Sequence, residues 1–362
     1  MKKVISTFLA LLFVVLTAFT VSAESNDITG ANWMSAVDGS LPITAINMPG
    51  SHDSTTQYVS ASIVSRTQGT SVLQQLYNGA RYFDMRLKIS GNKIIDVHGI
   101  SNCKTAYGLF AKDLLAADVV AQCEDFLSKN PGETILFLMK DSDEEKGTGF
   151  YSKFYDDIIL KNPEYWFLEN RIPTLDEVRG KIVLLRCAEI DKTRFDDSNG
   201  GINFENYPRI TSMKIDEFKL CPITKANGER ITDMFVQDSF RVEGKRKKAT
   251  IENFFNSDLS KSNFNICCTN AVLLRIPYAN AKDINSFLMS YNFESGKYYG
   301  IVLNDYVTPE LCEKIYMTNS NEMINAPRAA SETPEFFKSY SYFGVFLEEI
   351  RDWIVAVLCV GI

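Results

Sequence analysis

About seven short apolar segments, each ending in a polar or charged residue, constrain the fold of this 362-residue chain more than any other feature. Segments with the apolar spacing of a helix separate most of them. Buried strands that alternate with helices are typical of an α/β fold with a mainly parallel sheet, and about seven strands are enough to close a barrel. We therefore predict a single TIM-like (β/α) barrel. The predicted strands cover residues 41–48, 81–88, 94–98, 133–140, 180–186, 234–238 and 299–305, and the predicted helices cover about 72–78, 109–127, 149–162, 174–178, 249–260, 281–291 and 308–316.

The polar residues at the strand ends predict where a functional site lies. In a (β/α) barrel the carboxyl ends of the strands surround one mouth, and the active site is built there. We expect the first strand to end where Pro49 and Gly50 interrupt its apolar run, so that the next residues reach this mouth. The strand-end residues are His52, Arg86, His98, Lys140, Arg186, Asp238 and Asp305.

The chain contains only two histidines, and both belong to this set. Side chains alternate between faces along a strand, so Asp84 shares a face with Arg86, and Asp96 shares one with His98. A buried carboxylate or guanidinium is costly unless it is paired or used. Two core histidines and a structural ion pair would also explain the pattern, but two strand ends with nearby acids favour a catalytic site.

These side chains suit the cleavage of a phosphodiester by general acid–base catalysis. One imidazole takes a proton from a nucleophilic hydroxyl and the other protonates the leaving oxygen, since histidine titrates near neutral pH. A guanidinium binds the phosphate oxygens. The sequence has no G-x-S-x-G, P-loop or H-E-x-x-H motif, so we expect the attacking hydroxyl to come from water or from the substrate. A histidine-rich metal cluster is excluded, whereas a calcium site with oxygen ligands stays open.

Composition and the first residues indicate an exported protein that does not bind nucleic acid. The net charge of −7 lacks the basic character that nucleic-acid binding needs. Residues 1–23 have the lysines, apolar run and small-residue cleavage site of a signal peptide. Residues 24–322 form the predicted barrel, and residues 323–362 form a C-terminal tail to which we assign no role. The eight cysteines lack zinc-site spacing and are too few for a disulfide framework in a chain of this length.

Two surface segments leave a choice between lipid contact and ordinary structure. Residues 61–64 (Ala-Ser-Ile-Val) form either a lipid-facing apolar tip or part of the packing. The basic run 244–248 (Gly-Lys-Arg-Lys-Lys) either touches anionic lipid or forms a solvated turn before a helix, and we favour the turn.

Several motifs, taken in order, resemble those of a known family. M-P-G-S-H-D-S, G-A-R-Y-F-D-M-R, V-H-G and N-P-G-E-T-I-L-F-L-M-K resemble the X region of phosphatidylinositol-specific phospholipases C. R-G-K-I-V-L-L-R, F-V-Q-D-S-F and G-I-V-L-N-D-Y resemble its secreted bacterial members. The resemblance covers about residues 40–320. It implies a distorted (β/α) barrel, secreted and monomeric, that cleaves phosphatidylinositol at membrane surfaces to diacylglycerol and a 1,2-cyclic inositol phosphate. The inositol 2-hydroxyl is then the nucleophile, and glycosylphosphatidylinositol anchors are possible further substrates.

The resemblance also implies a role for each of five residues. His52 is the general base and pairs with Asp305, whereas His98 is the general acid and pairs with Asp53. Arg86 holds the phosphate. Calcium-dependent relatives usually have asparagine after the first histidine and an acid at the arginine position, so Asp53 and Arg86 imply the metal-independent group, with no cofactor.

The expected headgroup site departs from the family pattern. Lys140 and Asp238 match inositol-binding positions. The family's inositol-binding arginine aligns with Cys187, and we expect the adjacent Arg186 to substitute for it. The aromatic residue that stacks on inositol is usually tyrosine and is Phe240 in this chain, which keeps the ring face and loses the hydroxyl.

Two other functions stay open from the sequence. A non-catalytic lipid- or glycan-binding protein could use the same barrel, since fold does not fix function. It would have no need of a poised acid–base pair. A calcium-dependent phospholipase C is the second alternative.

Overall fold

The computed structural model describes residues 27–108, 110–142, 147–271, 276–327 and 329–334, together with Ile350 and Ile354. The predicted signal peptide and most of the predicted tail lie outside the described residues. Within the described part, no helix has the length and apolar character to cross a bilayer. Residues just after 322 pack against the barrel, because Ile324 N–H donates to Ala36 O and Ser331 N–H donates to Asn130 Oδ1.

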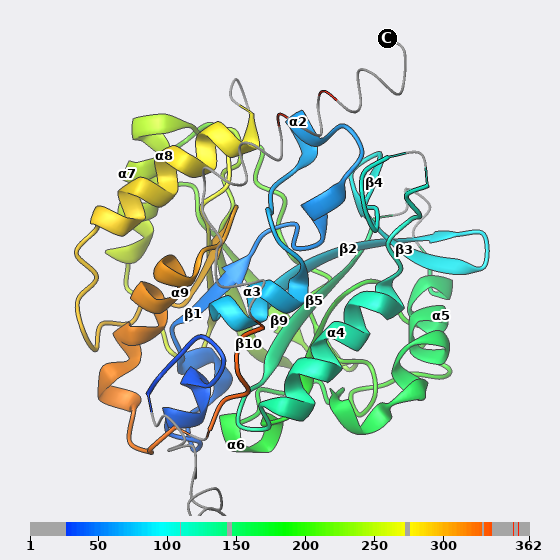
Figure 1. Ribbon diagram of the computed structural model, residues 1–362. Helices are drawn as coiled ribbons and strands as arrows, with labels where there is room; N and C mark the ends of the chain where they lie inside the picture. Colours follow the sequence, from blue (N-terminus) through cyan, green and yellow to red (C-terminus); the bar gives the residue numbers. More distant parts are fainter. Residues whose placement is uncertain are drawn as a thin grey trace, which may run out of the picture.

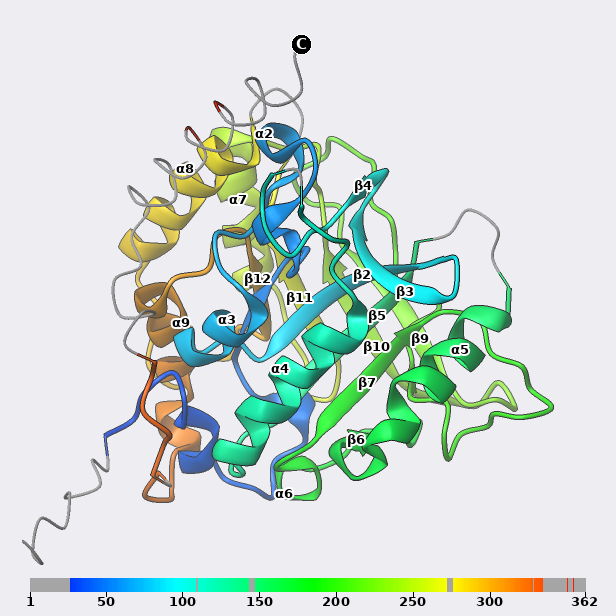
Figure 2. The ribbon, with the colours of Figure 1, turned by 45° about the vertical axis from the view of Figure 1, so that its right-hand side comes forward.

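A curled, mainly parallel sheet forms the centre of the molecule (Figures 1 and 2). Its strands follow the order β6-β7-β5-β2-β1-β12-β11-β10-β9, and only the β9–β10 pair in this order is antiparallel. Strand β3 pairs with β2 and β4, both antiparallel, and β8 pairs with β7. The strands are β1 Met48–Ser51, β2 Tyr82–Ser90, β3 Lys93–His98, β4 Ser101–Asn102, β5 Ile135–Asp141, β6 Trp166–Phe167, β7 Ile182–Cys187, β8 Ile202–Asn203, β9 Lys219–Thr224, β10 Arg230–Gln237, β11 Phe264–Cys268 and β12 Ile301–Asn304.

The predicted α/β barrel is confirmed, as an open, distorted one. Among the described residues the sheet runs from β6 to β9, and no backbone ladder joins β8 to β9. Side chains bridge this seam instead: Asn203 Nδ2 donates to Thr224 O over 3.4 Å, and Asn206 Nδ2 donates to Pro222 O over 3.1 Å.

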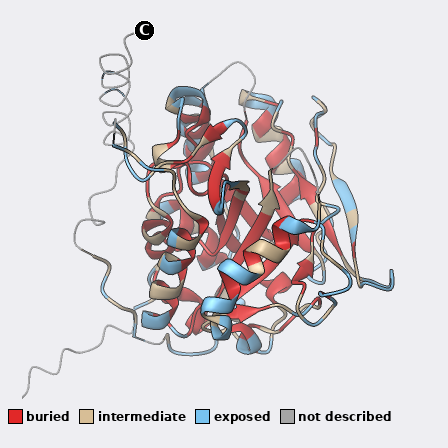
Figure 3. Ribbon diagram, turned by 90° about the vertical axis from the view of Figure 1, so that its right-hand side faces the viewer, coloured by how far each residue is buried: buried red, intermediate tan, exposed pale blue. Residues whose placement is uncertain are grey.

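Helices cover the outside of the sheet, and Figure 3 shows buried strands behind helices whose outer faces are exposed. Their apolar faces pack on a core formed mostly by the strands. The α-helices are α2 Ser62–Ser65, α3 Val72–Asn78, α4 Ala116–Lys129, α5 Gly149–Asp157, α6 Leu175–Val178, α7 Gly244–Phe255, α8 Pro277–Ser290 and α9 Pro309–Tyr316. The 3₁₀ helices are η1 Trp33–Ala36, η2 Ile43–Ala45, η3 Thr56–Tyr58, η4 Ile159–Lys161, η5 Pro163–Tyr165 and η6 Met317–Glu322.

Helix α3 has the bounds that the sequence predicts, and the residues at its two ends explain why. The Ser71 side chain accepts a hydrogen bond from Gln74 N–H and caps the first turn. Gly79 ends the helix at φ 110°, a left-handed conformation that a side chain disfavours.

Several predictions of local structure are wrong, and three of them concern the first strand and the basic run. Pro49 and Gly50 do not end the first strand but lie within β1, because their carbonyl groups and the N–H of Gly50 can still join the parallel ladders to β12 and β2. The apolar run before them forms η2. The basic run at 244–248 is no solvated turn but the first turn of α7, and its Lys247 is fully buried.

Candidate active site

One cavity of about 500 Å³ opens at the carboxyl ends of the parallel strands. Residues from α2, β2, β3, β5, β7 and several loops line it, including His52, Arg86, His98, Lys140, Asp238 and Phe240. In a barrel the loops after the strands carry the chemistry, and this cavity has that position. The structure thus brings together most of the residues that the sequence singles out.

His52 directly follows β1, which lies between β12 and β2 in the middle of the sheet. Its N–H donates to Asn304 O over 3.0 Å, and Gln68 Nε2 donates to both His52 O and Asn304 O over 2.9 Å. The imidazole is only 4% exposed, and its Nδ1 lies 2.7 Å from Asp305 Oδ1. Burial alone lowers the pKa of His52, but the carboxylates of Asp53 and Asp305 outweigh burial and raise this pKa to about 9.

The other ring nitrogen of His52 faces the centre of the site. Its Nε2 lies 3.1 Å from Arg86 Nη2, 3.1 Å from Asn270 Nδ2 and 3.3 Å from Asp53 Oδ2. With Asp305 accepting from Nδ1–H, Nε2 is the nitrogen available to take a proton.

Asp53 connects the two histidines to the arginine. Its backbone adopts a left-handed conformation with φ 42°, which turns the buried side chain back into the site. Asp53 Oδ2 lies 3.3 Å from His52 Nε2 and 3.2 Å from His98 Nε2, and Oδ1 lies 2.5 Å from Arg86 Nε. Burial raises the pKa of Asp53, but Arg86 and both histidines outweigh it, so the pKa is lowered and the carboxylate stays charged.

His98 ends β3, and both of its ring nitrogens face oxygen atoms. Nδ1 lies 2.6 Å from Ser65 O, a carbonyl that can only accept, and Nε2 faces Asp53 Oδ2. Both nitrogens are therefore placed to carry a proton. The imidazole is half-buried, so substrate can reach it from the cavity.

Asp84 lies between two cations that line the cavity. Its carboxylate contacts Arg86 Nη2 at 3.3 Å and Lys140 Nζ at 3.0 Å. Burial raises the pKa of Asp84, but Lys140 and Arg86 reverse this effect and hold the pKa well below its usual range. Lys140 Nζ also lies 4.2 Å from the centre of the Tyr207 ring, a cation–π contact.

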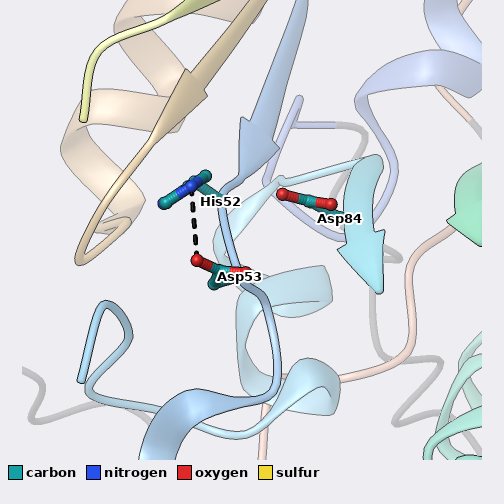
Figure 4. Close-up of side chains that lie close together, drawn as sticks. All are labelled: His52, Asp53 and Asp84. Carbon is teal, nitrogen blue, oxygen red and sulfur yellow. Dashed lines mark ion pairs between the residues drawn. The ribbon is translucent and has the colours of Figure 1, made fainter. Parts of the chain in front are cut away.

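His52, Asp53 and Asp84 also have ligand atoms within 4.8 Å of one another, close enough to hold a metal ion (Figure 4). The two carboxylates, however, already contact Arg86, and Asp84 contacts Lys140 as well. A divalent cation here would approach two fixed positive charges, so the donor set fits calcium poorly.

The structure places three of the four residues predicted for the headgroup site in the cavity and Arg186 outside its lining. Lys140, Asp238 and Phe240 line the cavity, whereas Arg186 points away from it. Arg186 Nε donates to Gly200 O over 2.7 Å, and the guanidinium also contacts Ala188 O and Glu205. Cys187 pairs in register with Lys140 and lines the cavity in its place, because successive side chains along β7 alternate between faces.

Four further side chains of the site were not predicted. Asn270 and Tyr207 contact residues of the site directly, and Arg209 lines the cavity. Buried Lys247 binds the turn that carries Asp238, through Gln237 Oε1 and Ser239 O, both at 3.3 Å. Asn270 had one usable signal, since it follows the short apolar run of β11.

The sequence matches the family model described as phosphatidylinositol-specific phospholipase C, X domain, over residues 42–188. This region carries both histidines and Arg86.

Residues 42–188 belong to the phosphatidylinositol-specific phospholipase C X-domain family.

Curated proteins are also similar to part of the chain. A 1-phosphatidylinositol phosphodiesterase from Staphylococcus aureus is 36% identical over 199 residues, which cover 51% of this chain and 58% of that protein. One from Listeria monocytogenes is 31% identical over 170 residues, covering 44% of this chain and 50% of that protein. The chain thus spans about half the length of the curated relatives it matches.

Solved structures of phosphatidylinositol-specific phospholipases C share the fold over most of the chain. A mutant of the S. aureus protein superposes with a TM-score of 0.62 at 24% identity, covering 80% of this chain and 98% of that one. The L. monocytogenes protein gives 0.59 at 22% identity, covering 80% and 99%. Another S. aureus structure concerns the modulation of that protein's membrane binding.

Proposed function

We propose that the protein is a phosphatidylinositol-specific phospholipase C that converts phosphatidylinositol to diacylglycerol and 1,2-cyclic inositol phosphate without calcium. One observation carries the proposal: the Asp53 carboxylate joins His52, His98 and Arg86 at the base of one open cavity. The family match over residues 42–188 supports the substrate class, and the arrangement of these side chains supports the reaction type.

In this reaction His52 acts as the general base in the molecules whose Nε2 carries no proton, and this fraction grows as the pH rises toward the His52 pKa of about 9. Nε2 takes the proton of the inositol 2-hydroxyl, whose oxygen attacks phosphorus, while Asp305 stabilises the resulting imidazolium through Nδ1–H. The bond from phosphorus to the diacylglycerol oxygen breaks, and His98 gives its Nε2 proton to that oxygen. Asp53 holds both imidazoles and the guanidinium of Arg86 in one geometry.

Arg86 binds the phosphate and stabilises the charge that builds on its oxygens. Its guanidinium is held by Asp53 and Asp84 and keeps a partly exposed face toward the cavity. These two ion pairs fix the position of a positive charge, which is the contribution a calcium ion would otherwise make. The calcium-dependent alternative is therefore less well supported.

Lys140, Asp238 and Phe240 form the proposed inositol site. The Asp238 carboxylate and the Lys140 ammonium suit the ring hydroxyls, and the Phe240 ring offers an apolar face. Burial raises the pKa of Asp238, with Lys140 opposing this effect.

A binding protein without catalysis is less well supported than an enzyme. Such a protein would gain nothing from two buried or half-buried histidines held on one carboxylate. Burying this many ionisable groups costs free energy, and catalytic sites are where such arrangements concentrate.

We infer that the enzyme is secreted, monomeric and peripheral at membranes, with free phosphatidylinositol and possible anchor lipids as substrates. The apolar side chains of Ile63 and Val64 on α2 support membrane contact, since they are 42% and 58% exposed and Val64 lines the cavity. This exposure supports the lipid-facing interpretation of residues 61–64.

Turnover of phosphatidylinositol vesicles in excess EDTA tests the proposal. The mature protein should keep full activity, and Arg86→Lys should lower it by about 10²-fold, because a point charge cannot reproduce the planar two-pronged contact. Arg194→Lys, at an exposed arginine paired with Asp156, is the control and should be neutral. Loss of activity in chelator that calcium restores would refute the metal-independent mechanism.

A further inference from the structure

Asn270 contacts the ring nitrogen that reacts, yet neither the motifs nor the acid–base pattern of the sequence includes it. Its side chain is only 4% exposed and lines the cavity. Nδ2 lies 3.1 Å from His52 Nε2, and within the described residues Oδ1 is buried without a hydrogen-bond partner.

The backbone just before Asn270 is held firmly. Thr269 N–H donates to Leu303 O over 2.9 Å, and the Thr269 hydroxyl donates to Asn304 Oδ1 over 2.9 Å. Gln237 Nε2 donates to Cys268 O over 2.7 Å. These bonds fix the end of β11 between β10 and β12, so the amide is preorganised toward Nε2.

Two N–H donors therefore converge on one atom. Arg86 Nη2 and Asn270 Nδ2 each lie 3.1 Å from His52 Nε2. When Nε2 takes a proton it can no longer accept a hydrogen bond, and both donors lose their acceptor. In the same step of the proposed reaction, negative charge grows on the phosphate oxygens beside them.

We propose that Asn270 is a further catalytic residue, whose amide joins Arg86 in binding a non-bridging phosphate oxygen as His52 becomes protonated. The proposal rests on the proposed phospholipase function. A neutral donor held in a buried site stabilises such charge without adding a further buried ion. Arg86 supplies the charge, and Asn270 supplies a second donor of fixed direction.

The first experiment compares two substitutions with a buried control. Asn270→Asp keeps the shape and removes the donor, and Asn270→Ala removes the whole amide. Both should lower kcat by about 10²-fold and change KM for short-chain phosphatidylinositol only a few-fold. Asn280→Ala removes another buried amide, on α8 and outside the cavity, and should leave kcat unchanged. A kcat for folded Asn270→Asp and Asn270→Ala within threefold of the parent value would overturn the proposal.

Sulfur substitution separates this role from a merely structural one. Each of the two non-bridging oxygens is replaced by sulfur in a separate phosphorothioate diastereomer of the substrate. The parent enzyme should cleave one diastereomer more slowly than the other. In Asn270→Ala the logarithm of the ratio of these two rates should fall to half of the parent value or less. An unchanged preference would overturn the proposal, because a variant that only misplaces His52 slows both diastereomers alike.

Phosphate binding tests the inference apart from turnover. With two histidines in the chain, imidazole NMR signals report on His52 directly. Titration with inorganic phosphate should shift the His52 signal, with about tenfold weaker binding in Asn270→Ala. If the parent protein does not cleave phosphatidylinositol but shows this difference, the proposed function fails and the Asn270 phosphate contact stands. Equal binding by both proteins would overturn the contact.

Discussion

A single carboxylate organises the chemistry at the scale of residues. Asp53 contacts His52, His98 and Arg86 within 3.3 Å, and a left-handed backbone at Asp53 makes this possible. Such backbone conformations cost free energy and persist where the surroundings enforce them, often at active sites. The Thr67 hydroxyl donates to Asp53 O over 3.1 Å and helps to hold the turn.

The charge on His52 links folding stability to pH. Its folded pKa of about 9 lies above the ordinary value of 6.5, because Asp53 and Asp305 outweigh burial. This stabilisation is therefore complete below about pH 6.5 and is lost as the pH rises through about 9. Urea unfolding should show stability falling over this window.

Asp305→Asn should lower the His52 pKa and flatten that pH dependence. Imidazole NMR titration gives the pKa directly, and Asp191→Asn, at an exposed carboxylate, is the control. A His52 pKa that is the same in Asp305→Asn and in the parent would contradict this assignment of charge.

The sequence predicts which ionisable residues lie near the site better than it predicts which of their side chains point into the cavity. His52, His98 and Arg86 were predictable because polar residues at the ends of apolar runs must reach the barrel mouth. Arg186 was not, since a strand places successive side chains on opposite faces and one residue of offset decides which enters the cavity. Asn270 carries no charge and follows a run whose cysteines resemble ordinary core residues.

At the scale of elements, the turn between β10 and α7 depends on a buried lysine. Lys247 Nζ contacts Gln237 Oε1 and Ser239 O, and Ser239 N–H donates to the same Gln237 oxygen over 2.8 Å. Burial lowers the pKa of Lys247, and nearby Asp238 opposes this effect. The ammonium therefore positions the strand end that carries Asp238.

Lys247→Met should raise KM for phosphatidylinositol by about tenfold, the effect of losing about 1.4 kcal/mol of binding. Thermal stability should change little, because removing a buried charge also removes its desolvation cost. The neighbouring Lys248→Met is the control, since Lys248 contacts Asp283 and not this turn. Unchanged KM in folded Lys247→Met would show that the lysine has no positioning role.

Helices and long strands were predictable from periodicity, whereas strand bounds near the site were not. The strand containing Pro49 and Gly50 survives because glycine allows close approach: a Cβ on Gly50 would lie 2.8 Å from Leu303 Cδ1. Lys247 lies in a run that resembles a solvated turn, and only its tertiary position buries it.

At the scale of the whole molecule, the cavity and the apolar tip lie on the same end of the barrel. Figure 1 shows α2 beyond the carboxyl ends of the strands. Val64 of this helix lines the cavity. A lipid headgroup can enter the cavity while its acyl chains stay in the membrane only if this end faces the bilayer.

Val64→Glu should lower turnover of vesicle phosphatidylinositol by about tenfold, because a carboxylate is repelled by an anionic surface and costly to bury. Hydrolysis of soluble 1,2-cyclic inositol phosphate should be unchanged, as it needs no bilayer. Leu160→Glu, at a similarly exposed position on η4, is the control. An equal loss of turnover on both substrates would show that Val64 acts within the active site and not through membrane contact.

The order in which products appear tests the central claim most directly. If the inositol 2-hydroxyl attacks phosphorus, phosphorus NMR of the early reaction must show the 1,2-cyclic phosphate first, with acyclic phosphate following slowly. A positioned internal hydroxyl can have an effective concentration of about 10⁵–10⁸ M, so it outcompetes water. A 2-O-methyl analogue should bind without reacting. Acyclic phosphate appearing first, or cleavage of that analogue, would make water the nucleophile and contradict the roles assigned to His52 and His98.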